Sequence, residues 1–149
     1  MNTLDEVDIS LATGTWKVKA AASVLGVAGV FFAFTGIQLF LVRFRSEWLE
    51  LVPWVHVAFA VALVFLAAMT YRARTWAAIG STLIGGLAFL GAVVWQAYAM
   101  FHGIFSLLGL ASVPAALAAT GLAVLAIGDA SRATAVRKKL HEAGMNLGF

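Results

Sequence analysis

The chain has 149 residues, of which 62% are apolar and 11% charged. A soluble domain is nearer half apolar and a quarter charged, so a water-soluble fold of this size has too little interior for these side chains. The net charge of +3 does not indicate a nucleic-acid partner, because the basic residues flank apolar runs. The lack of cysteine excludes disulfides, thiolate metal sites and cysteine nucleophiles.

The first two apolar runs each have the length of one membrane crossing, which takes about 20 apolar residues. Residues 1–17 are expected to form a cytoplasmic N-terminal segment, and a helix over 18–42 follows it. A second helix is expected over 53–71, because Pro53 suits the first turn of a helix, where its missing N–H is not needed.

The next charge-free stretch ends only at Gly128, which is far too long for a single crossing, and we expect it to fold as a helical hairpin. Its helices are predicted over 75–101 and 112–130. The second of them would start with Ser112 as its N-cap and Pro114 in its first turn.

The position of the hairpin turn has two further interpretations. A helix start at Ser112 leaves residues 103–111 in the membrane interface, as a short apolar helix or re-entrant turn. The chain could instead turn tightly at His102–Gly103. A kinked helix could also run straight through Pro114, since membrane helices tolerate proline.

The distribution of Lys and Arg predicts the orientation in the membrane. With a cytoplasmic N-terminus, only Arg43 and Arg45 lie outside. The other eight of the ten basic residues then lie in the cytoplasm: Lys17, Lys19, Arg72, Arg74, Arg132, Arg137, Lys138 and Lys139. Because cytoplasmic loops carry an excess of positive charge, we expect the chain to span a bacterial inner membrane with both termini in the cytoplasm.

Residues 131–149 form a basic cytoplasmic tail, expected to extend the fourth helix. Its candidate contacts with anionic lipid or with an acidic partner are Arg132, Arg137, Lys138 and Lys139. The alternative is that these charges serve only to set the orientation.

Polar side chains gather in the outer halves of the predicted helices. Gln38, His56 and Gln96 each come out about 9 to 12 Å from the membrane midplane, at 1.5 Å of rise per residue. Tyr98 and His102 lie above Gln96 on the same helix. These residues could line a pocket for a quinone head group, or could form interhelical hydrogen bonds that only stabilise packing.

One face of the third predicted helix carries the aromatic side chains Trp95, Tyr98 and His102. This pattern favours an aromatic belt at the membrane interface over a stacking site for a flat ligand. Because His56 and His102 both lie toward the outer side, they are also candidates for the two axial ligands of a haem b. The predicted depth of His102, about 20 Å from the midplane, places it too far from His56 for one iron. No cofactor, catalytic residue or metal site is predicted.

The sequence thus predicts an all-α, up-and-down bundle of four transmembrane helices with a C-terminal helical extension. Its expected role is a non-enzymatic structural or accessory subunit that meets other membrane subunits or associates with itself. The first alternative is a quinone- or haem-binding anchor of respiratory type, and the second is a passive channel formed by oligomerisation.

Single cysteines in this cysteine-free chain test the orientation, at Thr3→Cys, Ser46→Cys and Asn146→Cys. An impermeant thiol reagent added to intact cells should label only the cysteine at position 46, because only that loop is expected outside. Labelling at position 3 or 146 would contradict a cytoplasmic location of the two termini.

Overall fold

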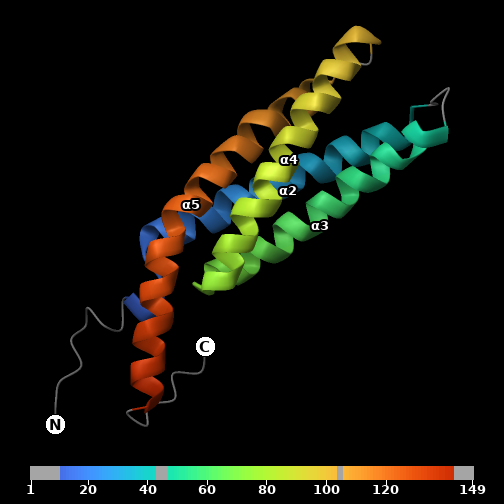
Figure 1. Cartoon of the computed structure of the whole chain (residues 1–149). Coiled ribbons are helices and arrows are strands. Elements are labelled where there is room, and N and C mark those ends of the chain that lie inside the picture. The colour runs from blue at the N-terminus through green and yellow to red at the C-terminus, as the bar shows by residue number, and fades with distance from the viewer. Residues whose placement is uncertain (1–10, 43–46, 104–105, 143–149) are drawn as a thin grey trace.

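The computed structural model describes residues 11–42, 47–103 and 106–142, and it consists mainly of four long helices (Figure 1). In chain order they are α2 (Trp16–Phe40), α3 (Val52–Tyr71), α4 (Thr75–Phe101) and α5 (Leu107–Glu142), with the 3-10 helix η1 (Glu47–Leu51) before α3. Each long helix has the length and apolar composition needed to cross a bilayer, as in a multi-pass membrane protein. The predicted all-α bundle of four membrane-length helices is confirmed.

Three of the helices lie close to their predicted positions. The helix predicted over 75–101 is α4, α3 starts one residue before the predicted start, and α2 is shifted by two residues toward the N-terminus. The fourth helix continues without a break to Glu142, so the first part of the basic tail prolongs it as predicted. The rest of the tail and most of the N-terminal segment lie outside the described residues.

The predicted start of the fourth helix at Ser112 is wrong. α5 begins at Leu107, and the chain turns at His102–Gly103, where Gly103 has a φ of 69°. The Ser112 hydroxyl does not cap a helix but donates a hydrogen bond to the Gly109 carbonyl oxygen at 2.6 Å. The physical reason is that an apolar segment at membrane depth must satisfy its own backbone groups, which a helix does and an irregular turn does not.

Pro114 consequently lies inside α5 rather than in its first turn. It has no N–H to donate to the carbonyl of Leu110, and membrane helices tolerate this loss where neighbours can compensate. The proline ring is exposed on the outside of the bundle, where it displaces no neighbouring helix.

Buried residues recur at alternating spacings of three and four along each long helix. On α5 they are all small as far as the last turns, and we call this face the small-residue seam: Gly109, Ser112, Ala116, Ala119, Ala123, Ala126, Ala130 and Ala133. A seven-residue repeat keeps one face of a helix against its neighbours only if the helices supercoil left-handedly. The spacing therefore favours a left-handed bundle.

Glycines allow α2 and α3 to approach closely. A Cβ atom on Gly29 would lie 3.2 Å from the Ala60 carbonyl oxygen, and one on Gly36 would lie 3.2 Å from the Pro53 carbonyl oxygen. Because lipid already solvates apolar side chains, such close backbone contact is a main source of helix association in membranes.

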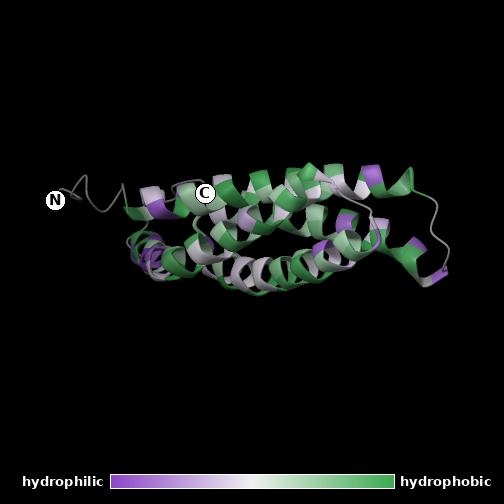
Figure 2. Cartoon of the chain, turned by 90° about the horizontal axis from the view of Figure 1, so that it is seen from above, coloured by the Kyte–Doolittle hydropathy of each residue, from purple (hydrophilic) through white to green (hydrophobic). Residues whose placement is uncertain are grey.

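The four helices form two pairs that separate toward one end of the bundle. α2 packs along α3 and α5, and α4 packs along α5, whereas α3 and α4 diverge from their short connection (Figure 1). We call the end with this connection, at Arg72–Arg74, the terminal end, and the end with Phe40 and Phe101 the distal end. Figure 2 shows hydrophilic residues gathered toward the two ends and apolar residues between them.

Substitutions at two adjacent alanines of α5 test the small-residue seam. Ala119 is fully buried in the main core, while Ala118 is exposed. Ala119→Leu should lower the free energy of unfolding by about 1 to 3 kcal/mol, the usual cost of overpacking. Denaturant titration in detergent micelles measures it.

The control, Ala118→Leu, adds the same atoms on the lipid side and should leave stability nearly unchanged. Equal effects of the two substitutions would show that the seam does not limit packing.

Candidate functional site

Four of the five polar and aromatic residues predicted to form one outer cluster are divided between two cavities at the distal end, and the fifth, His102, lines neither. Gln38 and Gln96 line a cavity between α2, α4 and the start of α5, which we call the amide cavity. His56 and Tyr98 line a cleft between α3 and α4, which we call the imidazole cleft. Trp95 lines both, so its indole stands between them.

The imidazole cleft has a volume of about 490 Å³ and exists because α3 and α4 diverge toward the distal end. Apart from the two polar rings, its walls are apolar. They are formed by Phe32, Leu49, Val52, Val55, Phe59, Leu87, Leu90, Gly91, Val94 and Trp95. Leu90 and Val94 are exposed on the outer surface of α4, so the cleft is continuous with a surface that faces lipid.

His56 is 5% exposed and does not face lipid. Its Nδ1 lies 2.9 Å from the Val52 carbonyl oxygen. A carbonyl oxygen only accepts, so Nδ1 carries the proton and Nε2 of the neutral ring is an acceptor. The ring packs at 5.6 Å from Phe32 and at 6.0 Å, edge to face, from Trp95.

Among the described residues, Gln38, His56 and Gln96 do not form hydrogen bonds with one another. The imidazole of His56 bonds within its own helix, and Gln38 accepts a hydrogen bond of 2.8 Å from the Ser106 hydroxyl. The reason is the size of Trp95. Its side chain is only 8% exposed and lies between the amide cavity, which contains Gln38 and Gln96, and the imidazole cleft, which contains His56. Trp95 is therefore part of the core, not of an interfacial belt as the sequence suggested.

Four rings follow one another from the core to the distal surface in the order His56, Trp95, Tyr98 and His102. Trp95 stacks on Tyr98 with ring centroids 5.6 Å apart, and Tyr98 stacks on His102 at 4.0 Å. His102 is exposed, and its Nδ1 lies 2.9 Å from the Tyr98 carbonyl oxygen. Within residues 11–42, 47–103 and 106–142, no group of three His, Cys, Asp or Glu residues could hold a metal ion.

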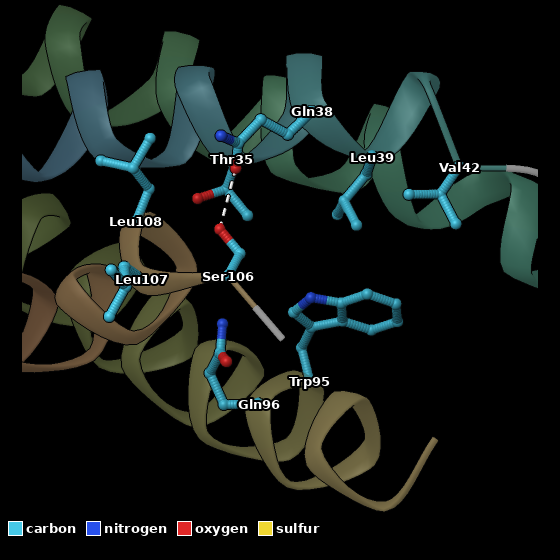
Figure 3. Close-up of a pocket in the computed structure, with 9 residues that line it drawn as sticks. All are labelled: Thr35, Gln38, Leu39, Val42, Trp95, Gln96, Ser106, Leu107 and Leu108. Atoms are coloured by element: carbon cyan, nitrogen blue, oxygen red, sulfur yellow. Dashed lines mark hydrogen bonds between the residues drawn. The ribbon is translucent and has the colours of Figure 1, made fainter. Parts of the chain in front are cut away.

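The amide cavity has a volume of about 570 Å³ (Figure 3). The lining residues are Thr35, Gln38, Leu39, Val42, Trp95, Gln96, Ser106, Leu107 and Leu108. Ser106 and its neighbours reach the cavity because α5 starts early, so sequence reasoning that placed this segment in the interface missed them. The Gln96 amide points from α4 into the space below Ser106 (Figure 3).

The basic residues of the tail have two different environments. Arg132, Lys138 and Lys139 are exposed, and Lys138 forms a surface ion pair of 3.9 Å with Glu142. Arg137 is half-buried, and its guanidinium group donates hydrogen bonds to backbone carbonyl oxygens of other segments of the chain. Its Nε donates to the Ala12 carbonyl oxygen at 2.8 Å, and its Nη2 donates to the Arg72 carbonyl oxygen at 2.7 Å.

Arg137 thereby joins α5 to the segment before α2 and to the connection between α3 and α4. Nearby, the Thr15 hydroxyl donates to an Asp129 carboxylate oxygen at 2.6 Å. Thr75 donates to the Ala130 carbonyl oxygen at 3.2 Å. We call the contacts of Arg137, Asp129 and Thr75 the terminal lock, because they connect all four helices at this end.

Comparison with protein-family models, curated protein sequences and solved structures found no match to this chain. Inference about its role therefore rests on the geometry of the two cavities and of the terminal lock.

Arg137→Gln tests the terminal lock. The substitution removes two charge-assisted hydrogen bonds from a half-buried position, so the free energy of unfolding should fall by about 1 to 2 kcal/mol. Unfolding in detergent measures the change.

Lys139→Gln is the matched control, since it removes the same charge from an exposed position and should change stability by less than about 0.5 kcal/mol. If both variants were as stable as the unmodified chain, Arg137 would not hold the terminal end together.

Proposed function

We propose that this chain is a non-enzymatic accessory subunit of a membrane assembly and that it binds a hydroquinone, the reduced form of a membrane quinone, in the imidazole cleft. The observation that carries the proposal is the buried His56 on the wall of a mainly apolar cleft between two lipid-facing helices. A small number of placed polar groups in an apolar pocket is the usual design of a ligand site.

The protonation of His56 favours the reduced ligand. With Nδ1–H bonded to Val52, Nε2 is left as an acceptor and needs a donor. A hydroquinone hydroxyl donates, whereas the carbonyl of the oxidised quinone does not. The rings of Trp95 and Tyr98 supply faces or edges for the flat head group, and the apolar walls suit an isoprenoid tail.

A haem is less well supported than a quinone. A bis-histidine haem needs two imidazoles that converge on one iron, and a quinone needs only one hydrogen-bonding group in the cleft. Of the two outward histidines, His56 lines the cleft, and His102 is exposed and stacked on the outer side of Tyr98.

We further propose an orientation of the chain in the membrane and a class of partner. With both termini in the cytoplasm of a bacterium, the distal end lies in the outer leaflet of the inner membrane, and hydroquinone would enter the cleft there. The partners would be other membrane subunits or a second copy, packed against the apolar outer faces of the helices.

His56→Leu tests the site. The dissociation constant of a short-chain hydroquinone such as decyl-ubiquinol should rise about tenfold, since one hydrogen bond of about 1.4 kcal/mol corresponds to that factor. Binding to the purified chain in detergent is measured by equilibrium dialysis, and the melting temperature shows that the fold is retained.

His141→Leu is the matched control, because His141 is exposed at the other end of the molecule and should leave binding unchanged. The oxidised quinone should bind the unmodified chain about tenfold more weakly than the hydroquinone. Unchanged hydroquinone binding in His56→Leu would refute the assignment, and a constant partner in mild-detergent purification would still support the accessory role.

A further inference from the structure

The side chain of Gln96 is the one buried polar group whose bonding the fold leaves incomplete in the part of the chain that the structure describes. It is 5% exposed, and its Oε1 atom is buried without a hydrogen-bond partner among the described residues. Burying an amide without a partner is unfavourable, and the effect is larger at membrane depth, where no bulk water compensates. A leucine of similar size would avoid this cost, so the retained amide points to a missing partner.

The opposite wall of the cavity is shaped to accept this amide. Gly109 of α5 faces Gln96, and a Cβ atom at Gly109 would overlap the Gln96 amide nitrogen. Glycine inside a helix is otherwise unfavourable relative to alanine. The pairing of Gln96 with Gly109 therefore fits a built site better than an accidental gap.

The two hydroxyl groups of the cavity already have partners. The Ser106 hydroxyl donates to Gln38 and accepts from the Gly109 N–H at 3.3 Å. The Thr35 hydroxyl donates to the Phe31 carbonyl oxygen at 2.9 Å. The Gln96 amide is thus the main group left for a ligand, and it offers both an acceptor and donors.

The lining of the cavity restricts the charge and shape of a ligand. None of the nine lining residues is charged, so nothing there compensates a phosphate or an ammonium group. Leu39, Val42, Leu107 and Leu108 provide apolar walls that suit a flexible acyl chain. The volume of about 570 Å³ is far larger than a single bridging water needs, so one water would not fill it.

From these observations we infer that the amide cavity binds an uncharged, hydroxyl-bearing lipid of the acylglycerol class, with its hydroxyl group bonded to the Gln96 amide. A hydroxyl group donates to Oε1 and accepts from the amide nitrogen, so a single hydroxyl can bond to both polar atoms of the Gln96 amide. Gln96 lies five residues before the end of α4, about 8 Å along the helix axis, a depth that a glycerol hydroxyl reaches beneath the lipid head groups. Trp95 separates this site from the imidazole cleft, so the inference does not depend on hydroquinone binding.

Three lipids with the same acyl chains test the chemistry on the purified full-length chain, with binding followed by native mass spectrometry. Dioctanoylglycerol has the free hydroxyl and should bind. Trioctanoylglycerol has no hydroxyl and should bind at least tenfold more weakly. Dioctanoyl phosphatidylglycerol is charged and should also bind at least tenfold more weakly.

Gln96→Leu should weaken dioctanoylglycerol binding at least tenfold while the melting temperature stays the same or rises, because the substitution removes an unpaired buried amide. Thr82→Val is the matched control. It removes a polar group from the same helix, where the hydroxyl bonds only to the Ala78 carbonyl, and it should leave lipid binding unchanged.

Equal binding of the diacyl and triacyl lipids would overturn the inference, and so would full binding by Gln96→Leu. If none of the three lipids binds, the cavity holds water only and the inference is wrong. The comparison of lipids uses the unmodified chain, so it decides the question even if a variant fails to fold.

Discussion

The close approach of α5 to its neighbours is the interaction on which the rest of the structure depends. In lipid, apolar side chains gain little from contact with one another, so helices associate where small side chains let backbones come near. Each buried position of α5 from Gly109 to Ala133 is glycine, serine or alanine. Opposite this seam, a Cβ atom on Gly85 of α4 would lie only 2.7 Å from the Thr120 hydroxyl oxygen. The distance between α4 and α5 is therefore set by backbone and first side-chain atoms.

The two ends of the bundle differ because the size of the buried side chains differs. The core cluster at the terminal end consists of Val18 and six alanines. The small alanine side chains let the helices approach closely there, and the terminal lock adds polar contacts between them. Toward the distal end the core contains Phe32 and Trp95. Phe32 lines the imidazole cleft, and Trp95 lines both cavities.

This division gives the molecule one closely packed end and one end with two cavities. Both cavities present a neutral polar group in apolar surroundings: an imidazole acceptor in one and an amide in the other. Such groups suit uncharged amphiphiles that are already dissolved in the bilayer. Affinity would then come from burial of the chain and selectivity from one hydrogen bond.

The amino-acid sequence by itself determined the class of fold and most helix boundaries. Charge-free runs of membrane length leave few alternatives, because every backbone group in lipid must bond within a helix. The same rule holds for residues 107–111, where it outweighs the capping preference of Ser112 and extends the fourth helix toward the N-terminus. The seven-residue spacing of small residues was also present in the sequence.

Only the tertiary structure decided how the polar residues combine. Gln38, His56 and Gln96 have similar depths, but depth says nothing about the rotation of each helix, and Trp95 divides them. The sequence also could not distinguish Arg137, which bonds to other segments of the chain, from Lys139, which is exposed. Both residues carry the same charge. Arg137 bonds to Ala12 and Arg72, which are 125 and 65 residues away along the chain. Such contacts depend on the packing of helices distant in sequence, and no local pattern records them.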